Sequence, residues 1–550
     1  MSATIDRSRT FGCICVESAT IRRAGLYKII DPKGPESRTY FDAIGHTLKT
    51  IVNYVDGTVS KSEVRLSIAM LLPFVLRSYH LARLQNWRVW RTVRLVSFHC
   101  PRRLSMRRAF SFAFLLGAVA MPSFAADPTF PLKDGDIWVM AGDSITAQHL
   151  HSNYFEAFCY ARYPNVKFAF RNSGVGGHTI PSTLARFEYD IAGWKPTVVS
   201  VELGMNDSGG TQTEDFVKNM GTMVARIRKS NARPVILTAS PVNDGTVSAK
   251  LAGRNQRLDE YATALKAFSE KEKLPFADQF HACLDPWGKN KPREKLQAAL
   301  ADLKQAASDD SLAGVEALRT FLAAQEKNPA KGVNLLGDPV HPGAPGQLMM
   351  AAALLKELGA DGFVSSAIVD APGDKAVVKG CEVTAIKGNS AGVAFDRLDG
   401  CQPFPIPDEA RSVLVLAPDV LALSQYTLAV KGLEDGDYLL KIGGVTCGRA
   451  TAKQMADGIN LTSLAPIAAS KGVNPIVAQM RDVLKAVADK EGLVGTWRGL
   501  SQKAHAKGAD AKLMEDLAPL TKKVEDADAK IREAAKPKKL HFEVVRATDK

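Results

Sequence analysis

Between residues 137 and 358, short apolar runs alternate with longer segments of helical periodicity, and this alternation constrains the fold most strongly. The apolar runs occupy 137–141, 166–170, 197–203, 234–238 and 274–277. Apolar residues recur at helical spacing over 151–162, 180–191, 213–229, 251–272 and 347–358. Such alternation is typical of βαβ units, which form a parallel sheet covered by helices on both faces. We therefore predict an α/β fold, with an inserted helical pair at about 288–327.

Four short polar motifs follow the predicted strands or precede the last helix. They read GDS at 142–144, NSGVGG at 172–177, GMND at 204–207 and DPVH at 338–341. In open parallel sheets, ligands bind in the crevice at the carboxyl ends of the strands. These motifs would bring to that crevice a nucleophile, a base with an orienting acid, and donors for an oxyanion.

The four motifs resemble the conserved blocks of the SGNH or GDSL hydrolases: GDS, a glycine after an Asn-x4 spacing, GxND and DxxH. The resemblance covers about residues 130–360 and departs from the family pattern only in the long gap before Asp338, which the helical insertion explains. It implies a flavodoxin-like three-layer α/β/α sandwich and a serine hydrolase that cleaves esters. It also implies that no metal and no cofactor takes part.

Three of the motif residues have the chemistry of a catalytic triad. Ser144 is a weak nucleophile until a base takes its proton. His341 titrates near neutrality, so it can accept that proton and return it to the leaving alcohol. Asp338 precedes His341 by three residues, and its carboxylate can hold the other imidazole nitrogen. We predict Ser144, Asp338 and His341 as the catalytic residues.

The oxyanion of the tetrahedral intermediate needs hydrogen-bond donors that are already in place. By the family resemblance, these are the backbone N–H groups of Ser144 and Gly177 and the side-chain amide of Asn206. Each of these residues also has an ordinary structural explanation when taken alone: Gly177 suits a turn, Asn206 a helix cap and Asp338 a loop cap. Their joint occurrence in order favours the functional interpretation.

Several other residues near the motifs could take part in binding. His151, Tyr154 and His178 lie close in sequence to the predicted nucleophile or oxyanion hole, and we predict that they contact substrate. The spacing of His149 and His151 is compatible with metal binding, but no carboxylate or cysteine cluster accompanies them. The GxSxG pattern at 388–392 resembles a nucleophile elbow, yet a strand-like run follows it where a helix is required, so we predict a hairpin turn.

The formal charge of +13 is confined to the beginning of the chain. Residues 1–105 carry 17 basic and 7 acidic side chains, whereas residues 126–550 carry 52 and 51. The body of the protein is therefore close to neutral and lacks the basic surface that nucleic-acid binding requires. We predict no nucleic-acid partner.

Residues 106–125 have the pattern of a secretory signal peptide. Arg107 and Arg108 form a basic start, 13 apolar or small residues follow at 109–121, and small residues precede a cleavage site before Ala126. Because such a signal begins a chain, we interpret residues 1–105 as a mis-assigned or unstructured extension; a real targeting segment is the alternative. We predict a secreted or periplasmic protein without stable membrane insertion, since the apolar run is too short to span a bilayer.

After residue 362 the composition changes to short alternating runs separated by turn residues. We predict strands at 377–386, 392–397, 412–416, 426–431, 438–442 and 540–545, and a helical segment over 451–536. Within that segment, Pro519 indicates a break or the start of a helix. Residues 363–550 would then form an accessory β-rich region with a helical appendage, and 126–362 a separable hydrolase domain. Cys381 and Cys401 flank a predicted hairpin, so in an oxidising compartment they could form a disulfide; free thiols are the alternative.

Export, and the lack of a long apolar lid near the motifs, favour acyl groups on carbohydrate as the substrate, such as acetylated polysaccharide. Within the same chemistry, a lipid esterase, lysophospholipase or thioesterase is the alternative, as is an acyltransferase that uses the same acyl-enzyme. A carbohydrate-binding protein with a vestigial site is the alternative from another class, and the intact triad speaks against it.

Overall fold

A computed structural model describes residues 130–243, 250–284, 337–411, 413–464 and 472–547. It also describes residues 467–468, scattered residues between 304 and 327, and four strands before residue 53. The predicted signal peptide at 106–125 and most of the predicted helical pair at 288–327 lie outside the described residues. The chain divides into two compact units, 1–119 and 120–550. Among the described residues, no helix is both long and apolar enough to cross a bilayer.

The first unit contains an antiparallel sheet that the sequence analysis did not predict. Its strands follow one another in chain order: β1 (Cys15–Glu17), β2 (Leu26–Ile30), β3 (Glu36–Phe41) and β4 (Thr47–Val52). Neighbouring strands pair antiparallel throughout, so this part of the chain forms a simple meander.

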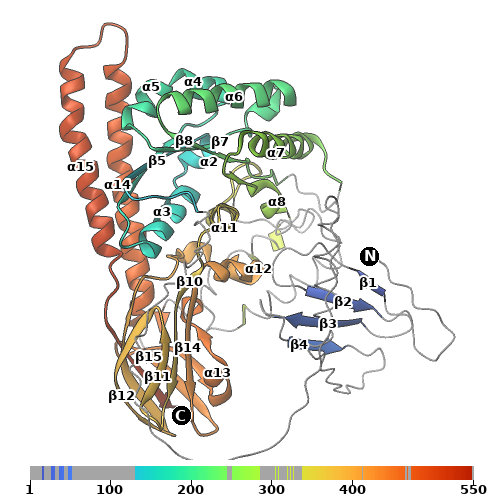
Figure 1. The fold of residues 1–550 in the computed structure, drawn as a ribbon, viewed down its shortest axis with the longest axis vertical. Coiled ribbons are helices and arrows are strands. Elements are labelled where there is room, and N and C mark those ends of the chain that lie inside the picture. Colours follow the sequence, from blue (N-terminus) through green and yellow to red (C-terminus); the bar gives the residue numbers. More distant parts are fainter. Residues whose placement is uncertain are drawn as a thin grey trace, which may run out of the picture. The chain divides into compact units, whose positions relative to one another are not determined.

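The second unit is built on a five-stranded parallel sheet in the order β6-β5-β7-β8-β9 (Figure 1). The strands are β5 (Asp136–Gly142), β6 (Phe168–Gly174), β7 (Val198–Glu202), β8 (Arg233–Leu237) and β9 (Phe276–Ala277). The order 2-1-3-4-5 is that of flavodoxin-like folds, in which the chain reverses direction across the sheet beside the first strand. The predicted α/β fold class is confirmed.

Helices cover both faces of this sheet because its strands are apolar on both sides. Trp138, Met140 and Val235 face one hydrophobic core, while Val139 and Val201 face the other. The first core is covered by α3 (His151–Arg162), α8 (Gln279–Leu284) and α11 (Ala344–Glu357), and the second by α4 (Ile180–Ala185), α5 (Phe187–Asp190) and α6 (Thr213–Lys229). Helix α7 (Gly253–Glu272) contributes to both cores.

The C-terminal residues form two further sheets, one of four strands and one of five. One has the order β11-β10-β14-β17, and the other has the order β12-β13-β20-β15-β16. Their bounds are β10 (Phe363–Asp370), β11 (Lys375–Lys379), β12 (Cys381–Asn389), β13 (Gly392–Asp399), β14 (Gln425–Lys431), β15 (Asp437–Ile442), β16 (Val445–Thr451), β17 (Ile459–Asn460) and β20 (Leu540–Arg546). A third hydrophobic core lies between these sheets. The final strand, β20, lies in the middle of its sheet, between β13 and β15.

Three expectations for this region need correction. The run at 412–416 is not a strand: α12 (Val413–Leu416) is helical, as is the following turn η5 (Pro418–Leu423). The helical segment expected over 451–536 divides into α13 (Ala452–Asp457), α14 (Pro475–Ala504) and α15 (Lys512–Ala534), with short strands between α13 and α14. Pro519 lies inside α15 instead of breaking it. Of the two alternatives left open for Cys381 and Cys401, the structure has the free thiols.

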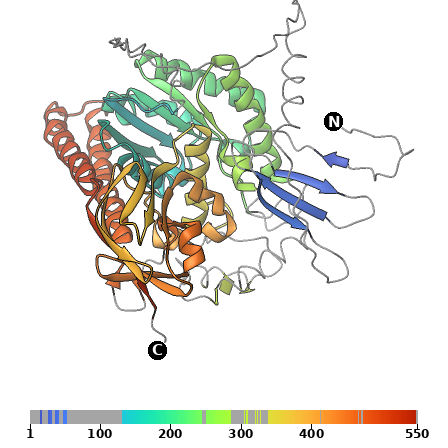
Figure 2. The ribbon, with the colours of Figure 1, turned by 60° about the horizontal axis from the view of Figure 1, so that its bottom comes forward.

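The antiparallel helices α14 and α15 pack against the α/β sandwich, as Figures 1 and 2 both show. Trp497 of α14 stacks on Trp194 with ring centroids 3.6 Å apart. The first hydrophobic core also contains residues from both sides of position 362, among them Phe158, Phe404 and Val487. The two regions therefore share apolar packing across position 362.

Buried charges also join the C-terminal helices to the sandwich. Lys490 of α14 has no exposed surface, and its ammonium donates to Glu156 Oε2 at 2.8 Å, to Phe170 O at 3.0 Å and to Glu491. Arg171 of β6 pairs with Asp528 of α15 at 2.7 Å. Burying charges costs solvation energy, so these groups are stable only while their partners remain in place.

Candidate active site

The structure brings the four motifs together at the carboxyl edge of the parallel sheet. Strand β5 ends at Gly142, and Ser144 begins the short helix α2 (Ser144–Ala147). The loop after β6 carries Gly177, and the loop after β7 carries Asn206. His341 stands shortly before α11, on a segment that reaches across to Ser144. This is the arrangement that the strand-end rule predicted.

Ser144, His341 and Asp338 form a continuous hydrogen-bonded chain. His341 Nε2 lies 2.7 Å from Ser144 Oγ, and His341 Nδ1 lies 2.7 Å from Asp338 Oδ2. With the Nδ1 proton donated to the carboxylate, Nε2 is free to accept the serine proton. The geometry is therefore that of a nucleophile, a general base and the acid that orients the base.

Local hydrogen bonds fix Asp338 in this role. Its Oδ1 accepts from the backbone N–H groups of Val340 and His341, both at 2.7 Å, while Oδ2 faces the imidazole. Partial burial opposes ionisation of Asp338, but the hydrogen bonds from the backbone and ring of His341 outweigh it and lower the pKa of the carboxyl. Asp338 therefore remains a carboxylate that can stabilise the imidazolium.

Asp143 fixes the turn that presents the nucleophile. Its side chain is fully buried, and Oδ1 accepts from Ile145 N at 3.0 Å, which caps α2. Burial raises the pKa of Asp143 to about 6, against the lowering effects of the Ile145 hydrogen bond and of nearby His341. Its Oδ2 accepts from the Asn206 amide at 3.3 Å, which ties the GDS turn to the loop after β7.

Two glycines allow the backbone of the site to pack closely. A Cβ added at Gly142 would stand 2.0 Å from Thr146 Oγ1, and one added at Gly174 would stand 2.3 Å from Ala147 N. Any side chain at these positions would push α2 away from its strand. Asn172 closes the same contact, since its amide donates to Thr146 O at 2.7 Å.

The residues of the predicted oxyanion hole lie near one another. A Cβ added at Gly176 would lie 3.9 Å from Ser144 Cβ, so the loop with Gly177 runs alongside the serine. Gly177 has a φ of +76°, a conformation that glycine adopts without strain. The Asn206 amide also donates to His178 O at 3.1 Å, so it adjoins Gly177 as well as Asp143. The structure thus brings Ser144, Gly177 and Asn206 to one place.

The residues predicted to contact substrate differ in their positions. His151 and Tyr154 lie on the inner side of α3, with only 1% and 3% of their surfaces exposed. His151 is hydrogen-bonded to Gln347 of α11, and burial lowers its pKa to about 4, so it is a neutral core residue. Contact of His151 and Tyr154 with substrate stays a prediction. His178 is partly exposed and accepts a hydrogen bond from Arg186 at 3.2 Å.

Sequence reasoning missed the buried side chains that support these loops. Glu202 at the end of β7 accepts from Thr146 Oγ1 at 2.6 Å, and burial raises its pKa well above the usual range. Arg186, Asp190 and Arg498 form a second group behind the loop of Gly177. The sequence alone predicts that charged residues in such amphipathic segments are exposed to solvent. Only the three-dimensional packing shows that these side chains are buried.

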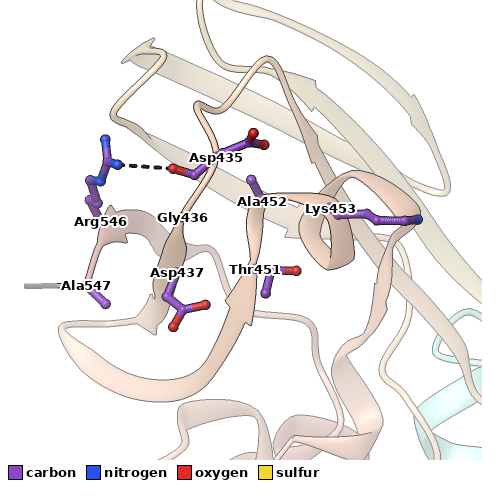
Figure 3. A pocket seen from close by; sticks show the side chains of 8 residues that line it. All are labelled: Asp435, Gly436, Asp437, Thr451, Ala452, Lys453, Arg546 and Ala547. Atoms are coloured by element: carbon purple, nitrogen blue, oxygen red, sulfur yellow. Dashed lines mark hydrogen bonds between the residues drawn. The ribbon is translucent and has the colours of Figure 1, made fainter. Parts of the chain in front are cut away.

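Two further polar features lie outside this site. Ser390, in the GxSxG pattern, lies in the turn of the β12–β13 hairpin and donates to Glu434, as the predicted hairpin requires. A polar pocket of about 450 Å³ lies at the end of β15, β16 and β20, and Figure 3 shows its lining side chains, including Asp437, Lys453 and Arg546. Within the described residues, no cluster of histidine, cysteine and carboxylate side chains could hold a metal ion.

The chain is similar in sequence or structure to several known proteins. Residues 140–348 match the sequence model of the GDSL-like Lipase/Acylhydrolase family. The acetylxylan esterase of Geobacillus stearothermophilus is 24% identical over 214 residues, which are 38% of this chain and 79% of that protein. A solved structure titled a gut microbial diltiazem-metabolizing enzyme aligns with a TM-score of 0.56 and 22% identity, over 76% of this chain and 99% of its own. A solved acetylxylan esterase from G. stearothermophilus aligns over 42% of this chain and 96% of its own, with 20% identity and a TM-score of 0.31.

Proposed function

We propose that this protein, whose residues 140–348 belong to the GDSL-like lipase/acylhydrolase family, removes O-acyl groups from carbohydrate. The protein is an ester-hydrolysing enzyme, and we propose that it acts through a Ser–His–Asp triad. The observation that carries the proposal is the hydrogen-bonded chain from Asp338 through His341 to Ser144. The similarity to an acetylxylan esterase favours acetyl groups on a polysaccharide as the substrate.

The reaction follows from the positions of the side chains. Ser144 Oγ attacks the ester carbonyl carbon while its proton passes to His341 Nε2, and Asp338 stabilises the imidazolium that forms. The oxyanion accepts hydrogen bonds from the N–H groups of Ser144 and Gly177 and from the Asn206 amide. When the C–O bond breaks, the His341 imidazolium protonates the leaving sugar oxygen, which departs as a hydroxyl group. Water, deprotonated by the same histidine, then hydrolyses the acyl-enzyme and frees Ser144.

A panel of esters tests this function. Purified enzyme is assayed on p-nitrophenyl esters from acetate to palmitate and on acetylated xylan and pectin, with Ser144→Ala as the matched control. We expect the highest kcat/KM on acetate, release of acetic acid from at least one polysaccharide, and a loss of about a thousandfold or more in the variant. A preference for palmitate would favour a lipid esterase instead, and full activity of Ser144→Ala would refute the triad.

The same proposal includes export, on the basis of the signal-like segment at 106–125. N-terminal sequencing and intact-mass measurement of the protein from the native host should give a chain that begins at or near Ala126. Peptides from 1–105 in the exported protein would contradict both the predicted start and the predicted cleavage.

A further inference from the structure

The loop that carries Gly177 contains three glycines and must nevertheless be rigid. It runs from Gly174 at the end of β6 to His178, just before α4, and it includes Gly176 and Gly177. Glycine gives a backbone its largest conformational freedom. An oxyanion hole works because its donors are fixed before the charge develops, so some contact has to hold this loop.

Arg498 of α14 holds the beginning of this loop. Its NH2 group donates to Gly174 O at 3.0 Å and to Asp190 Oδ2 at 2.8 Å, and its Nε donates to Asp190 Oδ1. The guanidinium therefore bridges the loop to the carboxylate of α5 in a two-pronged geometry that a lysine cannot reproduce. Only 17% of the Arg498 side chain is exposed, so water screens these contacts weakly.

Arg186 holds the end of the loop and is tied to Arg498 by the same carboxylate. Its Nε donates to His178 Nδ1 at 3.2 Å, and its NH2 donates to Gly142 O at 3.3 Å, next to the GDS turn. Its NH1 donates to Ser173 Oγ at 2.6 Å and to Asp190. Burial opposes ionisation of Asp190, but the hydrogen bonds and charges of the two arginines lower its pKa.

Helix α14 is anchored on both sides of Arg498. Trp497 stacks on Trp194, and Ser501 Oγ donates to Tyr189 O at 2.6 Å. A Cβ added at Gly193 would lie 2.9 Å from the Trp497 ring, so the contact is tightly packed. These contacts fix where the guanidinium of Arg498 stands relative to the loop.

We propose that Arg498, supplied by the C-terminal helix α14, is a positioning residue for the oxyanion hole. Arg498 acts through Gly174 and Asp190. Together with Arg186 it holds both ends of the 174–178 loop and so keeps Gly177 in place. Two guanidinium groups share one carboxylate, so the group also leaves one positive charge beside the loop. The inference rests on the proposed function, because it assumes that the Gly177 loop binds the oxyanion.

The experiment compares Arg498→Gln and Arg498→Lys with wild type in the full chain, with Arg481→Gln as the matched control. Arg481 lies on the same helix and also pairs with an aspartate, Asp408, but it makes no contact with the site. Two rates are measured: kcat for p-nitrophenyl acetate, and the rate at which a fluorophosphonate labels Ser144. Prolonged labelling counts the active sites, so kcat is expressed per active molecule.

We expect Arg498→Gln to lower both rates about 10- to 100-fold with KM nearly unchanged, because small displacements of a catalytic donor cost rates of this order. Both rates of Arg498→Lys should lie between those of Arg498→Gln and wild type. If Arg498→Gln does not fold, the rates of Arg498→Lys decide whether Arg498 is a positioning residue. Arg481→Gln should stay within about twofold of wild type. A purely structural role for Arg498 would lower the melting temperature or the number of active sites instead.

The outcomes separate the two proposals. If wild type is labelled at Ser144 but kcat per active site of the Arg498 variants is unchanged, the positioning role is refuted and the proposed function stands. If wild type is not labelled and hydrolyses none of the esters, the proposed function fails, and this inference fails with it. Equal losses in Arg481→Gln and Arg498→Gln would also refute the inference, because they would show a general effect of charge on α14.

Discussion

Replacing Lys490 by methionine should destabilise the protein more than any other single change on α14. The methionine keeps the apolar stem but removes three hydrogen bonds, to Glu156, to Glu491 and to Phe170 O. Burial raises the pKa of Glu156 to about 8 despite the nearby ammonium. Glu491 is ionised and would lose its main counter-charge inside the protein.

The size of the expected loss of stability follows from the burial of Lys490 and Glu491. Removing one partner of a buried ion pair typically costs about 3–5 kcal/mol, since the remaining charge is left without compensation. At roughly 2 cal/mol/K of unfolding entropy per residue, a unit of about 400 residues that unfolds cooperatively would lose about 4–6 °C in Tm. The matched control is Lys485→Met on the same helix. Lys485 is 74% exposed and pairs with Asp489, so its removal should change stability by less than about 0.5 kcal/mol.

Urea denaturation and calorimetry at pH 7 measure these differences. The double variant Lys490→Met/Glu491→Gln provides the internal check, because it removes the stranded carboxylate together with its partner. It should be more stable than Lys490→Met alone, and this non-additivity would identify the charge as the cause. If Lys490→Met lies within about 1 kcal/mol of wild type, or if the double variant is less stable than the single one, the reasoning is refuted.

Three more predictions follow from the site and its packing. Asn206→Ala should lower kcat on p-nitrophenyl acetate about 100- to 1,000-fold with little change in KM, and a change in KM alone would mean that the amide binds substrate but not the oxyanion. The ion pair with Lys490 outweighs burial and lowers the pKa of Glu491 to about 2, below its value in the unfolded chain. The ionised Glu491 therefore stabilises the folded protein above about pH 4.5, and this stabilisation is lost as the pH falls toward 2. Urea melts should therefore show a difference between wild type and Glu491→Gln that is larger at pH 6 than at pH 3, and an equal difference at both would contradict it. A chain of residues 126–362 should be insoluble or unstable, because it lacks α14 and α15 and exposes part of both sandwich cores; a soluble product with wild-type kcat on p-nitrophenyl acetate would show that the sandwich folds alone.

Much of the fold and the site could be predicted because the signals are local. The apolar strands and the motifs at their ends are contiguous stretches, and a parallel sheet brings the ends of neighbouring strands together. Ser144, Asp338 and His341 could therefore be proposed together although 197 residues separate the first from the last. What the structure adds is their hydrogen-bonded geometry.

The errors arose where the environment overrides the local pattern. The run at 413–416 is apolar and β-branched like a strand, yet it forms part of a helical segment packed on the first core. The burial of His151 and Tyr154 on α3 was likewise not predicted from the sequence. Lys490 and Arg498 resemble solvent-exposed residues of a polar helix, and nothing in the sequence identifies the partners that make their burial tolerable. The role of the C-terminal region could not be predicted for this reason.

The central place of β20 also determines when the protein can finish folding. Residues 540–546 pair with β13 on one side and β15 on the other, so the larger C-terminal sheet stays divided until this strand has been synthesised. Helices α14 and α15 are made just before that strand. Until residues 540–546 have been made, no strand joins β13 to β15, so this sheet is completed only after α14 and α15 have been synthesised. A chain that stops before residue 540 would leave open sheet edges at β13 and β15, and such edges favour pairing with other chains.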